Sequence, residues 1–289
     1  MNKLMLAAVL LIASLPLATA QGTYTKLHYP GSGYTFALGV NASGQVVGYY
    51  IMGAKSFRGG FLYTGGQFEA INFPDAGTTV LTGINDTGEI SGWAGTNDKE
   101  FAFTYNLQTQ TFTELPLFHY PEATCINDSG MVGGITKVQW EGYWAGFKWA
   151  PGQQPVVIDY PQSHAWETIV TGITASGGLV GYDQVQPDGV DNFYYNDGVF
   201  QAITIPGLTY PTVNGTNPAG TVLVGQYTAG ADFLSFLYSD GEVETLSFPG
   251  SDSTFANGVN ATGEVVGYFY SSEGTNGFTW TPPAADEKK

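Results

Sequence analysis

Basic residues and cysteine are both scarce in this sequence of 289 residues. Nine Lys and Arg stand against 25 Asp and Glu, Arg58 is the only arginine, and the formal net charge is −16. Nucleic acids and anionic lipids bind through clustered Lys and Arg, so this charge balance argues against both as partners. The single cysteine, Cys125, excludes a disulfide within the chain, so stability must come from packing.

Catalytic and metal-binding signatures are also missing. The sequence contains no H-E-x-x-H motif, no Walker loop and no G-x-S-x-G elbow. One cysteine and three histidines supply too few ligands for a structural zinc site. The acidic turns are too short for a calcium loop, which leaves calcium bridging between neighbouring loops as the open alternative. Cys125 stands where five other repeats have glycine, which favours a small buried residue over a nucleophile. We therefore expect no catalytic residue, no metal site and no cofactor.

The first twenty residues have the features of a secretory signal peptide. Lys3 supplies the positive charge, residues 4–17 form an apolar run, and Ala18-Thr19-Ala20 is a small-residue cleavage site. We expect cleavage after Ala20, leaving a mature chain without a membrane span and with a polar tail at 284–289. The sequence therefore predicts a secreted or periplasmic protein.

The rest of the sequence is built from six copies of one repeat of about 43 residues. Its first anchor is an apolar-polar-apolar-Pro unit, typical of a strand that ends at the proline. These units end at Pro30, Pro74, Pro116, Pro161, Pro206 and Pro249. Repeats one to six follow these prolines in order.

Each repeat then carries an Asn-x-x-Gly tight turn, in which the side chain caps the backbone and the glycine takes a positive φ. The first turn position holds Asn41, Asn85, Asn127, Thr174, Asn217 and Asn260. A second glycine closes the next strand at Gly48, Gly92, Gly134, Gly181, Gly225 and Gly267. A third strand contains Phe61, Phe103, Phe147, Phe193, Phe236 and Phe278. Turns such as Asn196-Asp197-Gly198 lead back to the Pro-terminated strand, so every repeat predicts four short antiparallel strands.

The two ends of the chain complete one repeat between them. The sixth copy stops at Pro283 without its Pro-terminated strand, and a spare strand of that kind lies alone at residues 24–29. We therefore predict an all-β fold: a six-bladed β-propeller over residues 21–283, with four antiparallel strands per blade. The N-terminal strand would join the last blade and close the ring. A linear β-solenoid is the alternative, but it gains nothing from a split copy.

Several of these blocks resemble a known family of bacterial extracellular repeat proteins, the HAF family. The similar blocks are GINDTGEISG and KEFAFTY, with related copies in other repeats: GVNASGQVVG, RGGFLY, GVNATGEVVG and NGFTW. The resemblance implies an exported repeat protein with a propeller-like fold and carries over no catalytic residue. The chain departs from the His-Ala-Phe triplet that names the family, because only Ala102-Phe103 keeps its last two residues.

The repeats differ most in the loops of repeats three and four. In a propeller, the loop before the first strand and the loop between the second and third strands share one face, which we call the loop-rich face. The Asn-x-x-Gly turns lie on the opposite face. In repeats three and four the loop-rich face collects aromatic rings, carboxylates and imidazoles from His119, Tyr120, Glu122, Trp140, Glu141, Trp144, His164, Trp166, Glu167 and Asp183. Loops on a rigid scaffold often carry function, so these residues form the candidate ligand-binding site, although they also fit a simple cover over the channel mouth.

Three functions remain open for this sequence. The favoured one is a monomeric, non-enzymatic module that binds an extracellular glycan or protein through blades three and four. A hydrolase or lyase acting on an extracellular polymer at the same face would need His119 or His164 beside a carboxylate. A structural protein of the envelope or matrix would need no pocket above the channel.

Overall fold

Every element in the described part of the chain is a β-strand. The computed structural model describes residues 22–53, 57–96, 99–116, 119–138, 142–161, 167–185, 189–230 and 232–283. These ranges form 24 strands, which confirms the all-β prediction. Within them, no helix has the length and apolar character that crossing a membrane takes. The predicted signal peptide and polar tail lie outside the described residues.

The strands pair into six antiparallel units of four, which we number by the repeat that supplies their first strand. The first strands are β2 (Tyr34–Val40), β6 (Thr78–Ile84), β10 (Glu122–Ile126), β14 (Thr168–Ile173), β18 (Thr212–Thr216) and β22 (Ser253–Val259). The second strands are β3 (Val46–Met52), β7 (Glu89–Gly95), β11 (Val132–Lys137), β15 (Leu179–Val185), β19 (Val222–Ala229) and β23 (Val265–Ser271). The third strands are β4 (Phe57–Thr64), β8 (Glu100–Asn106), β12 (Trp144–Trp149), β16 (Gly189–Asn196), β20 (Asp232–Ser239) and β24 (Gly274–Thr281). The fourth strands are β5 (Gln67–Ala70), β9 (Thr111–Glu114), β13 (Val156–Ile158), β17 (Val199–Ile203), β21 (Glu242–Leu246) and β1 (Thr23–Leu27).

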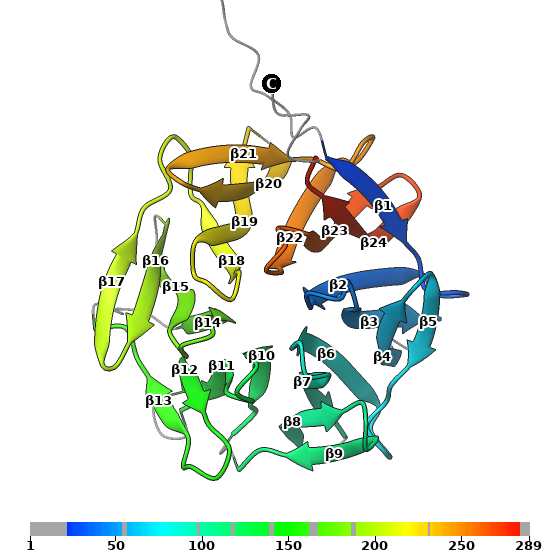
Figure 1. Ribbon diagram of the computed structural model, residues 1–289, viewed down its shortest axis with the longest axis vertical. Coiled ribbons are helices and arrows are strands. Elements are labelled where there is room, and N and C mark those ends of the chain that lie inside the picture. Colours follow the sequence, from blue (N-terminus) through cyan, green and yellow to red (C-terminus); the bar gives the residue numbers. More distant parts are fainter. Residues whose placement is uncertain are drawn as a thin grey trace, which may run out of the picture.

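Hydrogen bonding groups these units into one twelve-stranded sheet and three four-stranded sheets. The large sheet contains units six, one and two, which are joined by the single parallel pairs Tyr34–Thr275 and Arg58–Thr78. Figure 1 shows the units arranged around a common centre, with the first strand of each unit nearest to it. We refer to these first strands as inner strands.

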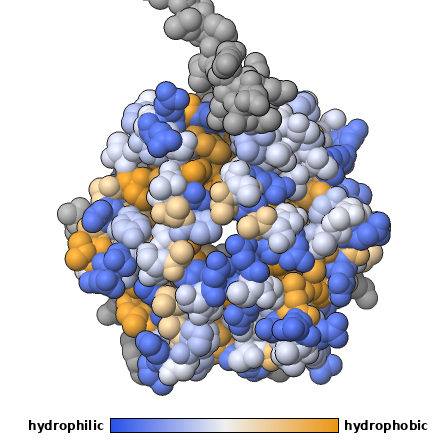
Figure 2. All heavy atoms as spheres, in the orientation of Figure 1, coloured by the Kyte–Doolittle hydropathy of each residue, from blue (hydrophilic) through white to orange (hydrophobic). Residues whose placement is uncertain are grey.

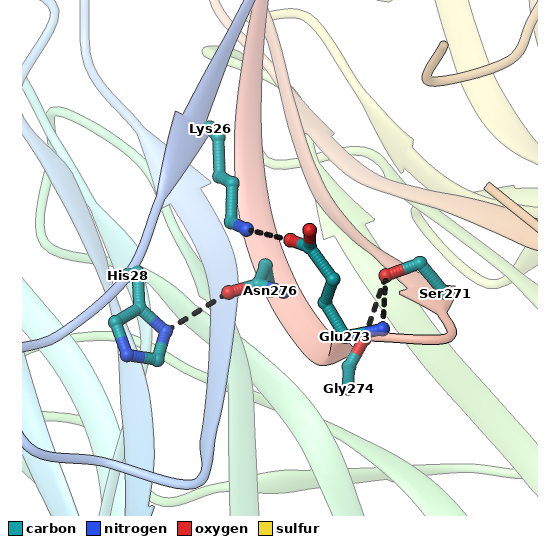
Figure 3. A network of polar contacts seen from close by, with 6 residues as sticks. All are labelled: Lys26, His28, Ser271, Glu273, Gly274 and Asn276. Atoms are coloured by element: carbon teal, nitrogen blue, oxygen red, sulfur yellow. Dashed lines mark hydrogen bonds and ion pairs between the residues drawn. The ribbon is translucent and has the colours of Figure 1, made fainter. Parts of the chain in front are cut away.

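The N-terminal strand β1 supplies the fourth strand of unit six. It pairs antiparallel with β24 over five residues, as the split sixth repeat predicts. Leu27 is 1% exposed at the end of this strand. Beside it, Lys26 Nζ lies 2.9 Å from Glu273 Oε2, and His28 Nδ1 lies 2.9 Å from Asn276 Oδ1 (Figure 3). The two ends of the chain are therefore held together by backbone pairing, a buried leucine and polar contacts.

The core of each unit is a phenylalanine packed on a glycine of the adjacent strand. The six pairs are Gly48–Phe61, Gly92–Phe103, Gly134–Phe147, Gly181–Phe193, Gly225–Phe236 and Gly267–Phe278. All six phenylalanines are fully buried. A Cβ on any of these glycines would overlap a carbonyl oxygen of the inner strand and press on the ring. This close approach explains why the glycine recurs in every repeat.

Candidate functional site

A cavity of about 280 Å³ lies where the six inner strands meet. All six units line it, from the middle of each inner strand to the Asn-x-x-Gly turn at its end. Figure 2 shows a hollow near the centre of the face that it views, with hydrophilic residues on part of the rim. The cavity is thus at the turn end of the inner strands, whereas the sequence placed its candidate site at the opposite end.

The asparagines around this cavity take part in the scaffold. Asn85 Oδ1 accepts a hydrogen bond from the N–H of Glu89 at 2.8 Å, and the turn glycine Gly88 has a φ of 80°. These contacts confirm the predicted turn. The structure adds a bond between units, because Asn85 Nδ2 donates to the carbonyl of Asn127 in the next unit at 2.9 Å. The same bond to the next unit is made by Asn41, Asn127 and Asn260.

A second ring of side chains lies at a β-bulge within every inner strand. The bulged residues are Leu38, Thr82, Thr124, Thr171, Asn214 and Asn257. Four of them donate to a carbonyl of the following unit. Thr124 Oγ1 donates to Val170 at 2.7 Å, and Asn257 Nδ2 donates to Ala37 at 3.1 Å. These polar groups of the cavity wall therefore tie neighbouring units together.

Cys125 also lines the cavity, but its thiol is not an activated nucleophile. The residue is 8% exposed on β10, which agrees with the expected small buried residue on an inner strand. Burial raises the pKa of the thiol to about 12. Because the thiolate is the reactive form, this shift disfavours a nucleophilic role for Cys125.

The ten residues proposed from sequence divide into two groups. Trp140, Glu141, His164 and Trp166 lie outside the described residues. The others are positioned by units three and four: His119 and Tyr120 precede β10, Glu122 begins it, Trp144 begins β12, Glu167 precedes β14, and Asp183 lies in β15.

The structure brings only some of this second group together. An isolated parallel bridge joins Trp144 to Glu167, so these two lie side by side at the boundary of units three and four. Asp183 is fully buried, and its Oδ1 accepts a hydrogen bond from Thr168 at 3.3 Å. Tyr120 is 51% exposed. Among the described residues, no hydrogen bond or ion pair joins the His119 imidazole to a carboxylate.

The carboxyl group of Glu122, on the same face, has a raised pKa. The residue begins an inner strand, at the position that Phe36 and Phe255 occupy in units one and six. Burial and, to a smaller extent, the nearby Glu100 raise the pKa of its carboxyl from 4.5 to about 7, against an opposing effect of Arg58. The carboxyl is therefore partly protonated near neutral pH.

A cluster of aromatic rings lies at the same end of the inner strands in units one and six. Phe36 stacks on Tyr49 with ring centroids 4.5 Å apart, and Phe255 stacks on Tyr268 at 4.8 Å. The rings of Tyr268 and Phe36 form a T-shaped pair with centroids 4.9 Å apart, which joins the two units. Tyr270 and Phe233 extend the cluster, at 5.4 and 5.9 Å from Phe255. We call these six residues the aromatic platform.

The sequence interpretation did not single out this platform. The signal for it is a difference between repeats within the strands, since the pairs equivalent to Phe36 and Tyr49 are Val80 with Trp93 and Glu122 with Ile135. Arg58 lies beside the platform, with its guanidinium carbon 5.8 Å from the Tyr49 ring centroid. An aromatic surface, the only arginine and a partly protonated carboxyl thus share one end of the inner strands.

Comparison with known proteins relates this chain to others through its fold. No family model matches the sequence, and no curated protein matches it. The structure superimposes on TolB from Acinetobacter baumannii with a TM-score of 0.59 and 11% identity, over 82% of this chain and 63% of that one. It superimposes on the β-propeller domain of the Trilobed protease from Pyrococcus furiosus with a TM-score of 0.54 and 12% identity, over 83% and 79%. The fold is that of a β-propeller.

The similarity extends to a gluconolactonase from Xanthomonas campestris. That match has a TM-score of 0.53 and 9% identity, and covers 94% of this propeller and 99% of the other chain. Identities this low establish the fold and nothing about activity, because one propeller scaffold hosts many functions.

Proposed function

We propose that this protein is an exported, six-bladed β-propeller that binds a ligand at its loop-rich face and catalyses no reaction. Six antiparallel units of four strands support the blade count. The pairing of β1 with β24, together with the hydrogen bond from Asn257 to Ala37, supports closure of the ring between units six and one. The signal-like residues 1–20 and the resemblance to HAF repeats support export to the periplasm or beyond.

The distribution of exposed aromatic and large apolar side chains carries the binding proposal. Seven of them lie at the loop-rich ends of the strands or just before an inner strand: Tyr34, Met52, Phe57, Tyr120, Tyr210, Phe233 and Tyr270. Each is between 37% and 58% exposed. Apolar side chains gathered on one face of a soluble protein mark an interaction site. The polar side chains around the cavity at the opposite end instead bond to neighbouring units.

Glu122 favours an enzyme as the second candidate. A carboxyl with a pKa of about 7 suits general acid or base catalysis near neutral pH. The enzyme would act on an extracellular polymer bound at the same face.

Incubation of the mature chain with arrayed glycans and peptides tests both candidates. The binding proposal expects retention of at least one ligand, recovered intact, by the wild type and by the variant Glu122→Gln. Cleavage of the ligand by wild type and its loss in Glu122→Gln would establish the enzyme instead. A protein that retains nothing on either array would contradict both and leave a structural role.

A further inference from the structure

The aromatic platform combines rings at two depths. Phe255 is 9% exposed at the wall of the inner strands, whereas Tyr270 and Phe233 are 42% and 43% exposed. Phe36, Tyr49 and Tyr268 are half-buried between these limits. The rings therefore grade from buried to exposed, and Tyr270 and Phe233 present aromatic surface to solvent.

Arg58 lies in the same row of residues as the exposed end of the platform. Register partners run from Tyr270 to Thr275, Tyr34, Ile51 and Arg58, across β23, β24, β2, β3 and β4. Directly opposed residues of antiparallel strands point to the same side of the sheet, so Tyr34 and Arg58 share one side of unit one. A chain of contacts also links Arg58 to Tyr270 through the rings of Tyr49, Phe36 and Tyr268, with successive separations of 5.8, 4.5, 4.9 and 5.7 Å. Several rings in succession fit a short oligosaccharide better than a single sugar.

The charges around the platform select against an acidic ligand. Arg58 is the only arginine of a chain with a formal net charge of −16. Glu100 and Glu122 both belong to its electrostatic neighbourhood, because Glu100 and Arg58 act on the Glu122 carboxyl in opposite directions. A polyanion would meet two nearby carboxyl groups and repulsion from the molecule as a whole. The same three side chains can exchange hydrogen bonds with neutral hydroxyl groups.

A neutral carbohydrate satisfies both features. The C–H face of a pyranose ring is flat and apolar and stacks on an aromatic ring, while its equatorial hydroxyls point sideways toward polar partners. We propose that the aromatic platform, with Arg58 beside it, binds a neutral oligosaccharide. This proposal rests on the proposed binding function and names its site and ligand class.

Isothermal titration calorimetry of the mature chain tests the proposal with defined probes. The probes are the neutral hexasaccharides cellohexaose, mannohexaose and xylohexaose, and the acidic hexagalacturonate. We expect at least one neutral hexasaccharide to bind and hexagalacturonate not to bind. Tyr270→Ala and Arg58→Ala should each weaken that binding roughly tenfold, whereas Tyr270→Phe, which keeps the ring, should not.

A matched control and three outcomes make the test decisive. Val199 is 58% exposed in β17 and belongs neither to the platform nor to the exposed side chains of the loop-rich face, so Val199→Ala should bind within about twofold of wild type. Thermal melting by circular dichroism checks that all variants fold. If a neutral hexasaccharide binds but Tyr270→Ala and Arg58→Ala leave its affinity unchanged, the platform is the wrong site and the binding function stands.

The remaining outcomes separate ligand class from function. Binding of hexagalacturonate alone, or of arrayed peptides alone, would overturn the neutral-carbohydrate assignment and keep the binding function. Absence of binding in the titrations and on both arrays would overturn the platform proposal together with the proposed function.

Discussion

Shortening Leu27 to alanine tests whether the N-terminal strand holds the two ends of the propeller together. Leu27 is 1% exposed and packs in one core cluster with Val40, Val46 and Phe61 of unit one and Val266 of unit six. Its side chain therefore bridges the units that the split repeat brings together. Buried Leu→Ala replacements cost about 2–5 kcal/mol, through lost burial and the cavity left behind. For a domain of this size, that loss lowers the melting temperature by roughly 5–15 °C.

Urea unfolding followed by tryptophan fluorescence measures this loss, and Lys26→Ala in the same strand is the control. Lys26 pairs with Glu273 at 2.9 Å, but the two side chains are 40% and 75% exposed. Exposed ion pairs of this kind contribute about 0–1 kcal/mol. If Leu27→Ala unfolds at the same urea concentration as Lys26→Ala, β1 adds no packing energy and the argument for closure is wrong.

Three further predictions concern the inner parts of the units. Glu122→Gln should be as stable as wild type near pH 4.5 and about 1–3 kcal/mol more stable than wild type by pH 8. The reason is that the raised carboxyl pKa of about 7 makes ionisation of Glu122 costly in the folded state across that window. Urea midpoints from pH 4.5 to 8 measure the difference in stability, and a difference that does not change with pH would contradict the prediction. Asn85→Asp keeps the turn acceptor but loses the donor to the next unit, so it should lower the free energy of unfolding by about 1–2 kcal/mol. Asn85→Ala loses the acceptor as well and should lower it more. Equal urea midpoints for the two variants would show that the turn cap contributes nothing. Gly225→Ala should prevent soluble folding or lower the free energy of unfolding by more than about 3 kcal/mol, because its Cβ would overlap the inner-strand carbonyl. In the control Gly95→Ala the Cβ meets only ordinary contacts, so this variant should be tolerated. Similar soluble yields and melting temperatures for the two variants would refute the packing argument.

The sequence predicted the strand order well because the rules that set it are local. Asn85 and Gly88 define a tight turn within four residues, and Gly225 opposite Phe236 defines a packed strand pair. The split sixth repeat also predicted where β1 pairs, because an unpaired strand edge at each end leaves one solution. Because each feature recurs in all six repeats, a match between the pattern and a strand or turn is not expected to arise by chance.

The sites were harder to predict because they depend on contacts between distant units. The bond from Asn85 to the Asn127 carbonyl depends on the spacing of two sheets, which no single repeat encodes. Phe36 and Tyr268 are far apart in sequence and meet only because units one and six are neighbours. The loops of repeats three and four differ visibly in length, whereas Phe36 and Tyr268 replace other residues within the strands β2 and β23. Glu122 was found from sequence, but its raised pKa arises from burial and from Glu100 on another unit.

The most direct test of the binding site is a crystal structure of the mature chain with the hexasaccharide that binds most tightly in the titrations. The account predicts a pyranose ring stacked on the exposed Tyr270, with Arg58 hydrogen-bonded to a sugar hydroxyl. A sugar bound in the cavity at the Asn-x-x-Gly end, or against Trp144 and Glu167 of units three and four, would contradict it.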